Sequence, residues 1–253
     1  MLNAETTRHA IVEHTRRLAA SATAAGPGAA VPTAPAWTVA DLVRHVGQTQ
    51  HWVAEIIERR ITDPTRLPTE LATLPAGPGE WPAWLAESAQ RVADACTDLD
   101  APVFNASGDE RSGVRFWLSS MLNEAVIHGF DAATAAARPA DIDADVAAAL
   151  ITNHLTMLTS PTWALQRPAS AEALRGTGQT LLWRAADTTD AWLIERHPEG
   201  ATWRHETGPA DVTVTGPAES LLLTLTRRIP LTGADGDVEL AQHWLDNTAH
   251  ASN

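Results

Sequence analysis

The hydrophobic residues in the first two-thirds of the chain recur at intervals of three and four, which is the spacing of amphipathic helices. The clearest stripe contains Val39, Leu42, Val46 and Val53, and it follows Thr38, a residue type that commonly caps a helix N-terminus. Proline and glycine residues separate the periodic segments. This pattern predicts helices over residues 4–24, 39–60, 80–98, 113–137 and 143–159.

Beyond Arg175 the pattern changes to short runs in which hydrophobic and polar residues alternate, separated by turn-forming residues. These runs predict strands over residues 180–185, 191–196, 202–206 and 211–216, and the segments after them predict helices over 217–227 and 237–249. We therefore expect a helical bundle over residues 1–165, followed by a small α+β domain over residues 175–253.

The composition excludes several classes of protein. The 253 residues carry a formal net charge of −13, and Cys96 is the one cysteine. An acidic chain lacks the basic stripe that binds nucleic acids or anionic membranes, and one cysteine excludes an intrachain disulfide or a CxxC redox pair. The sequence has neither an apolar run long enough to span a membrane nor an N-terminal signal-peptide stretch. We expect a cytoplasmic protein, a monomer by default, with no nucleic-acid or membrane partner.

One pair of an imidazole and a carboxylate is predicted to face the hydrophobic core. Three such pairs are four residues apart on predicted helices: His9/Glu13, His51/Glu55 and Glu124/His128. At about 100° per residue, the first two pairs lie on the polar side of their helices, whereas Glu124 and His128 enter the hydrophobic side of theirs. His45 also flanks the hydrophobic side of its own helix. A carboxylate buried there needs a partner, a proton or a metal ion.

Two interpretations of these three residues remain open on the pattern alone. His45, Glu124 and His128 could form a buried hydrogen-bonded network without a metal. They could instead be the two histidines and one carboxylate of a catalytic divalent ion, most often zinc, with a position left open for water, a thiolate or a substrate oxygen. Asp131, one turn after His128, could then orient the imidazole by accepting a hydrogen bond, or it could be a carboxylate on the helix surface.

Two segments resemble the N-terminal module of the mycothiol-dependent maleylpyruvate isomerase family, which is one of the DinB-like four-helix bundles. The segments are WTVADLVRHVGQTQHWV over residues 37–53 and NEAVIHGFDAATA over residues 123–135. The matching residues are Trp37, Asp41, Leu42 and His45 in the first segment, and Glu124, His128 and Asp131 in the second. The resemblance implies that His45, Glu124 and His128 are the metal ligands.

The C-terminal part resembles the second domain of the same family, in which two strands, a helix, an arginine and a further helix follow one another. The family implies that this arginine holds a carboxylate of the substrate by bidentate pairing. Here Thr226 replaces the usual small residue and is followed by Arg227 and Arg228, so either arginine is a candidate. Alternatively, both are helix-end arginines that lie near backbone carbonyl groups.

The resemblance implies an enzyme that uses a divalent metal, zinc for preference, together with mycothiol or another low-molecular-weight thiol. A metal lowers the pKa of a thiol, so that thiolate is present at neutral pH. The thiolate could add to a small electrophilic substrate and leave again, which gives isomerisation, or it could remain attached, which gives S-transfer. A hydrolase or lyase that uses metal-bound water is the alternative. A third class is a binding protein for small ligands without catalytic activity. Cys96 is expected to be a buried, unreactive thiol rather than the nucleophile.

Overall fold

The computed structural model describes residues 2–107 and 111–248, and these fall into two compact units. The helical unit contains residues 2–106 and 111–141, and the C-terminal unit contains residues 142–248 together with Ser107. The protein is therefore a mixed helical and sheet structure with an N-terminal helical region, as the hydrophobic pattern predicts. Within the described residues, no helix is both long enough and apolar enough to cross a membrane.

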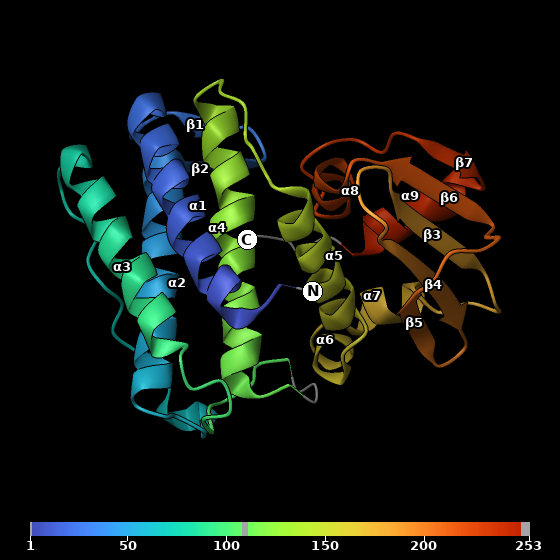
Figure 1. The fold of residues 1–253 in the computed structure, drawn as a ribbon, viewed down its shortest axis with the longest axis horizontal. Coiled ribbons are helices and arrows are strands. Elements are labelled where there is room, and N and C mark those ends of the chain that lie inside the picture. The colour runs from blue at the N-terminus through green and yellow to red at the C-terminus, as the bar shows by residue number, and fades with distance from the viewer. Residues whose placement is uncertain (1, 108–110, 249–253) are drawn as a thin grey trace. The chain divides into compact units, whose positions relative to one another are not determined.

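Long helices form the core of the helical unit, with a small hairpin inserted between the first two (Figure 1). Its elements are α1 (Ala4–Ala25), β1 (Ala30–Val31), β2 (Ala34–Thr38), α2 (Val39–Glu58), α3 (Trp81–Ala95) and α4 (Gly113–Ala135), with 3₁₀ turns at Pro64–Arg66 and Pro78–Glu80. Helix α1 packs against α3 and α4, and α2 packs against the same two helices. Each helix buries one hydrophobic face in this way, which is the main source of its stability.

A buried polar network joins three of these helices. The Gln50 side chain on α2 donates to Thr15 Oγ1 on α1 at 2.8 Å and accepts from Ser88 Oγ on α3 at 2.6 Å. All three side chains are fully buried. Because an unpaired buried amide costs free energy, these bonds favour one alignment of α1, α2 and α3 over others.

The C-terminal unit is a five-stranded sheet with accompanying helices. Its elements are α5 (Ala144–Leu158), α6 (Pro161–Gln166), α7 (Pro168–Ala173), β3 (Thr180–Ala185), β4 (Ala191–His197), β5 (Gly200–His205), β6 (Val212–Gly216), α8 (Ala218–Leu225), β7 (Ala234–Gly236) and α9 (Val238–Asn247). The strand order is β5-β4-β3-β6-β7; the β3–β6 pair is parallel and the other pairs are antiparallel.

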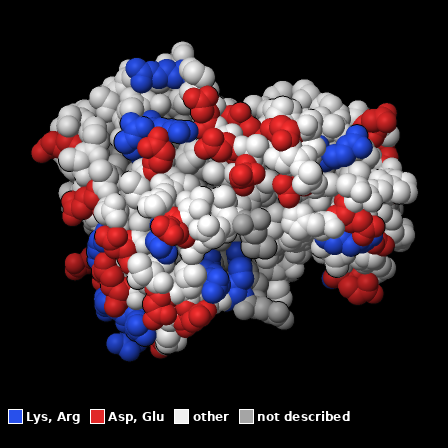
Figure 2. All heavy atoms as spheres, viewed as in Figure 1, with Lys and Arg blue, Asp and Glu red and all other residues white. Residues whose placement is uncertain are grey.

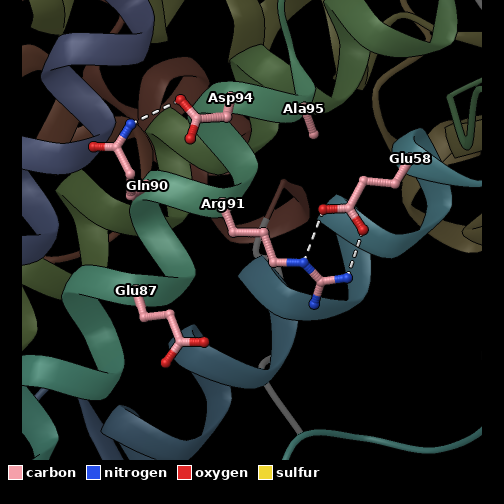
Figure 3. Close-up of a pocket in the computed structure, with 6 residues that line it drawn as sticks. All are labelled: Glu58, Glu87, Gln90, Arg91, Asp94 and Ala95. Carbon is pink, nitrogen blue, oxygen red and sulfur yellow. Dashed lines mark hydrogen bonds and ion pairs between the residues drawn. The ribbon is translucent and has the colours of Figure 1, made fainter.

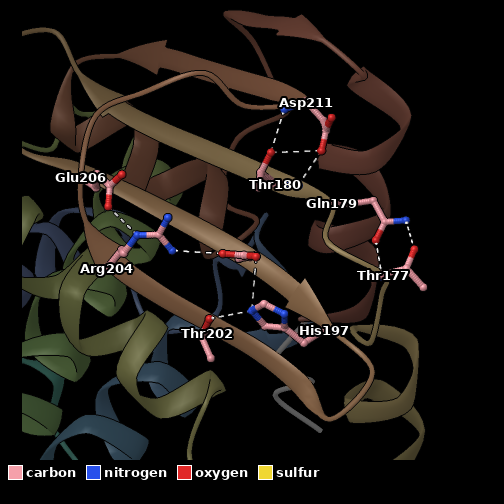
Figure 4. A network of polar contacts seen from close by, with 9 residues as sticks. Thr177, Gln179, Thr180, His197, Thr202, Arg204, Glu206 and Asp211 are labelled. Atoms are coloured by element: carbon pink, nitrogen blue, oxygen red, sulfur yellow. Dashed lines mark hydrogen bonds and ion pairs between the residues drawn. The ribbon is translucent and has the colours of Figure 1, made fainter.

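Polar side chains fasten the exposed parts of this sheet (Figure 4). At the start of the parallel pair, the backbone N–H of Thr180 donates to the Asp211 carboxylate at 2.7 Å, and the N–H of Asp211 donates to Thr180 Oγ1 at 3.0 Å. On β5, Arg204 donates to Glu195 of the neighbouring strand at 3.2 Å. Exposed ion pairs of this kind contribute little to the free energy of folding. We assign these contacts a structural role in pairing the strands. On the face shown in Figure 2, acidic and basic side chains are interspersed.

Every helix and strand predicted from the sequence is present, with ends displaced by at most a few residues. The hairpin between α1 and α2, the short helices α6 and α7, and strand β7 were not predicted, because segments of two to six residues carry little periodicity. The structure and the predicted ranges place residues 142–165 differently. Helix α5 packs against α8, so this segment groups with the C-terminal unit.

Two glycines in helix interiors give opposite predictions for stability. A Cβ at Gly47 on α2 would lie 2.2 Å from the Trp84 ring, whereas a Cβ at Gly129 on α4 would meet nothing closer than 3.9 Å. Gly47→Ala should therefore lower the free energy of unfolding by about 1–3 kcal/mol through overpacking. Gly129→Ala should raise it by about 0.5–1 kcal/mol, because alanine is the better helix former. Chemical denaturation measures both, and equal effects of the two substitutions would contradict the packing at Trp84.

Candidate metal centre

The three predicted ligands converge where α2 packs against α4. His45 projects from α2, and Glu124 and His128, one turn apart, project from α4. Oε2 of Glu124 lies 2.9 Å from Nε2 of His45 and 3.3 Å from Nε2 of His128. One ligand-type atom from each residue lies within 4.8 Å of the other two. The structure thus brings together side chains that are 79 positions apart along the chain.

Local hydrogen bonds fix the start of the helix that carries His45. The Thr38 hydroxyl accepts from the N–H of Asp41 at 3.3 Å, and the Asp41 carboxylate accepts from the N–H of Thr38 at 3.0 Å. This reciprocal capping box satisfies two N–H groups that the helix itself leaves without partners. It also sets the direction in which α2 leaves the hairpin, and hence the position of His45 two turns later.

The donor set and its spacing fit a divalent ion. Two imidazole nitrogens and one carboxylate oxygen are common ligands of zinc, and bonds of about 2.0–2.1 Å in a tetrahedron separate neighbouring ligand atoms by about 3.3 Å. The observed separations of 2.9 and 3.3 Å are close to this value. The same distances also describe hydrogen bonds from imidazole N–H groups to one carboxylate, so the geometry is compatible with both interpretations drawn from the sequence.

The three side chains differ in how far they are exposed to solvent. The side chain of His45 is 38% exposed and that of Glu124 is 25% exposed, whereas His128 is only 9% exposed. The centre is therefore anchored in the interior at His128 and reaches solvent at His45.

A buried carboxylate orients the His128 ring from behind. Oδ2 of Asp131 lies 2.9 Å from Nδ1 of His128, and Asp131 is fully buried. The Thr33 hydroxyl, in the turn of the hairpin, donates to Oδ1 of the same carboxylate at 2.6 Å. Asp131 therefore holds the proton of His128 on Nδ1 and directs Nε2 toward Glu124 and His45, which is the usual arrangement around a metal-binding histidine.

Trp37, immediately before the helix cap, covers both imidazoles. The centroid of its indole lies 5.0 Å from that of His45, in a tilted arrangement, and 5.9 Å from that of His128, in a stacked one. The two imidazoles meet edge to face with a centroid distance of 5.0 Å. The indole thus forms a wall of the centre.

The charges of the centre reinforce one another. Burial alone raises the pKa of the Glu124 carboxyl, but hydrogen bonds from His128 and His45 more than offset this effect and hold the pKa well below its ordinary range. Burial alone lowers the pKa of the His128 imidazole, but hydrogen bonds to Asp131 and Glu124 raise the pKa to about 9. In the metal-free protein, an ionised Glu124 therefore lies beside a protonated His128 at neutral pH.

A separate surface pocket between α2 and α3 contains none of the predicted site residues (Figure 3). It is lined by Glu58, Glu87, Gln90, Arg91, Asp94 and Ala95. Arg91 closes one side by a bidentate pair with Glu58, at 2.8 and 2.6 Å. Gln90 donates to Asp94 at 2.8 Å. These contacts pair Arg91 with Glu58 and Gln90 with Asp94, as expected of a solvated groove between two helices.

The two arginines predicted to hold a substrate carboxylate belong to the C-terminal unit, at the end of α8. Arg227 is exposed, has a left-handed φ of 62°, and donates from Nη1 to the carbonyl of Leu245 at 3.4 Å. Arg228 donates from Nη1 to the carbonyl of Thr226 at 3.0 Å. Arg228 thus contacts a carbonyl at the end of its own helix, whereas Arg227 contacts a carbonyl of α9.

Cys96 is buried, and burial raises the pKa of its thiol to about 12. A thiol with so high a pKa is protonated at neutral pH and is a poor nucleophile. Sequence reasoning missed Thr33 as part of the centre. The signal available was weak, because a threonine after Val31-Pro32 has no periodic context that would place it next to Asp131.

The pKa of His128 predicts how pH changes the stability of the metal-free protein. The folded-state pKa of about 9 exceeds the unfolded value of about 6.5. Its stabilising contribution is therefore complete below about pH 6.5 and is lost as the pH rises through about 9. Denaturation of chelator-treated protein between pH 6 and pH 9.5 should show this loss, and His128→Gln should lack it. An identical pH dependence in both proteins would contradict the assignment.

Comparisons with known proteins identify a family for most of the helical unit. The family model described as the mycothiol maleylpyruvate isomerase N-terminal domain matches residues 8–133, a range that contains all three ligand-type residues. No curated protein matches the chain. A solved structure described as a UbiJ-SCP2 ubiquinone synthesis protein aligns with 42% of this chain and 91% of its own length, at 18% identity. Its TM-score of 0.27 is too low to indicate a shared fold. Through residues 8–133 the chain belongs to the family of the mycothiol maleylpyruvate isomerase N-terminal domain.

Proposed function

We propose that this protein is a metal-dependent enzyme that uses mycothiol or another low-molecular-weight thiol to isomerise, or to transfer sulfur to, a small electrophilic substrate that bears a carboxylate. The observation that carries the proposal is the convergence of His45, Glu124 and His128 inside the domain that matches the family. We also propose that α1 to α4 are the DinB-like four-helix bundle of that family, since each of α1 and α2 packs against both α3 and α4.

Nε2 of His45, Nε2 of His128 and a carboxylate oxygen of Glu124 would hold the ion, with zinc as the first choice. A bound ion of this kind supplies positive charge that lowers the pKa of a thiol, so that thiolate is available at neutral pH. The protein's own contribution is to keep Glu124 ionised, to hold a proton on Nδ1 of His128 through Asp131, and to cover the ligand rings with Trp37. Cys96 takes no part, because its thiol is buried and protonated.

The same ligand set could instead activate water, which would make the protein a hydrolase or a lyase. The access to solvent on the His45 side suits either a thiol or a water molecule. The two activities differ in whether an added thiol is needed, and this difference is measurable.

The first experiment is metal analysis of the purified wild-type protein and of His128→Ala. Wild type should bind about one divalent ion per chain. Loss of the hydrogen-bond partner of a metal ligand weakens metal binding by roughly 10- to 100-fold. His128→Ala removes a ligand itself, so it should weaken metal binding by more than this. His51→Ala is the matched control, because His51 is on the same helix as His45 but contacts Trp84 and Arg91 instead. Near-zero metal in wild type and variant alike would overturn the proposal.

A second arm separates thiol from water chemistry. In cobalt-substituted protein, addition of mycothiol should change the visible absorption spectrum, because a thiolate replaces an oxygen ligand. An unchanged spectrum, together with turnover that needs no thiol, would favour the hydrolase or lyase instead.

We propose that Arg227 or Arg228 binds the carboxylate of the substrate. The left-handed backbone at Arg227 allows a clean test, because Arg227→Gly removes the guanidinium and keeps the turn. Ala137, just after α4, has a similar φ of 51°, so Ala137→Gly is the matched control for the backbone effect.

Both glycine variants should raise the free energy of unfolding by up to about 1 kcal/mol. Arg227→Gly, or else Arg228→Ala, should also raise KM for an acidic substrate by about tenfold or more. An unchanged KM in both arginine variants would remove this role.

A further inference from the structure

The hairpin between α1 and α2 makes several contacts with the candidate centre, although it supplies none of the three ligands. It consists of β1 and β2, residues 30–38, and we call it the site hairpin. Strand β1 contacts both α2 and α4, which are the two helices that carry the ligands. Figure 1 shows β1 and β2 beside the ends of these helices. The site hairpin thus lies where it can act on both sides of the centre.

The first contact runs from the hairpin turn to His128 through a buried carboxylate. The Thr33 hydroxyl donates to Oδ1 of Asp131 at 2.6 Å, and Oδ2 of Asp131 lies 2.9 Å from Nδ1 of His128. The terminal torsions of aspartate and histidine side chains are broad, so their own helix does not fix the planes of these groups. A donor on one carboxylate oxygen fixes that plane and keeps the other oxygen directed at His128.

The second contact comes from the strand that leads into α2. The Trp37 indole stacks on His128 and lies tilted against His45, at 5.9 and 5.0 Å between centroids. It therefore restricts rotation of both imidazoles about the same soft torsion. Thr38, the next residue, caps α2 and fixes the helix that presents His45. Within this one short segment, Thr33 thus constrains His128 through Asp131, Trp37 constrains both imidazole rings, and Thr38 constrains the axis of α2.

We propose that the site hairpin is the positioning element of the metal centre: Thr33 holds Asp131 in the plane that directs Nε2 of His128 toward the ion, and Trp37 fixes the planes of both imidazoles. This inference rests on the proposed function for its metal-dependent part only. Thr33 and Trp37 are positioning residues, because they act through Asp131, His128 and His45. Their removal should disorder the ligand planes without unfolding the helices.

The decisive comparison is Thr33→Val against Thr33→Ser. Valine keeps the shape of threonine and loses the donor, whereas serine keeps the donor. Thr23→Val controls for loss of a threonine hydroxyl elsewhere, because Thr23 is exposed on α1 and donates a hydrogen bond to the Ala19 carbonyl.

The first readout is proton exchange. In chelator-treated protein, NMR should detect the Nδ1–H proton of His128 held by Asp131. Its exchange with water should be about 3- to 10-fold faster in Thr33→Val, the range expected for one hydrogen bond. Thr33→Ser and Thr23→Val should match wild type.

The second readout is the dissociation constant for Zn²⁺, measured by competition with a chelating dye. Thr33→Val should weaken binding by about 3- to 10-fold, and Thr33→Ser should restore it. Trp37→Leu should weaken binding as well, whereas Trp37→Phe, which keeps an aromatic face, should retain most of the affinity. Thermal unfolding midpoints of all variants show whether any change is one of global stability instead.

The outcomes separate the two proposals. If wild type binds Zn²⁺ and Thr33→Val equals Thr33→Ser in both readouts, the positioning inference is wrong and the proposed function stands. If wild type binds no metal, the proposed function fails, and the proton-exchange measurement alone decides whether Thr33 positions Asp131. Equal losses of affinity in Thr33→Val and Thr23→Val would also overturn the inference, because the effect would then be a general one of hydroxyl removal.

Discussion

The structure of the helical unit depends on one constraint: the Glu124 carboxylate lies at the contact between α2 and α4, where an ionised group needs compensation. His45 and His128 supply it from the two helices, with atoms 2.9 and 3.3 Å from the carboxylate oxygen. Leaving Glu124 without these partners would cost free energy. The packing of the two helices and the geometry of the centre therefore depend on each other. Any shift of α2 along α4 would separate His45 from Glu124, so the arrangement that buries the hydrophobic faces must also align the three side chains.

Each element around this contact fixes a different part of the centre. Helix α4 sets the spacing of Glu124, His128 and Asp131 through its regular turn, while the capping box at Thr38 sets where α2 begins. The site hairpin joins these two through Thr33 and Trp37. The polar network of Gln50, Thr15 and Ser88 fixes α1 and α3 against α2 by the same principle, since a buried polar group accepts only the arrangement that satisfies it.

Much of the fold and of the centre was predictable. The long helices and the strands of the sheet carry strong periodicity, and their predicted and observed ends agree within a few residues. The inward direction of Glu124 and His128, and the place of His45 beside the hydrophobic side of its helix, were also predictable from the helical period. The family resemblance implied that the three residues meet, as the structure shows. The hairpin, the short helices α6 and α7 and strand β7 were missed, and α5 groups with the sheet because it packs against α8. Two- to six-residue elements owe their form to neighbours and not to their own pattern.

The sequence by itself determined which residues form helices and strands, which polar side chains face inward, and the family to which residues 8–133 belong. These properties depend on residues close together in the chain, where spacing and propensity act directly. Only the tertiary structure decided that Thr33 donates to Asp131, 98 positions away, that Trp37 covers both imidazoles, and that Arg227 and Arg228 contact backbone carbonyls. Such contacts join distant segments, and they exist because the packing of hydrophobic faces leaves those polar groups beside one another.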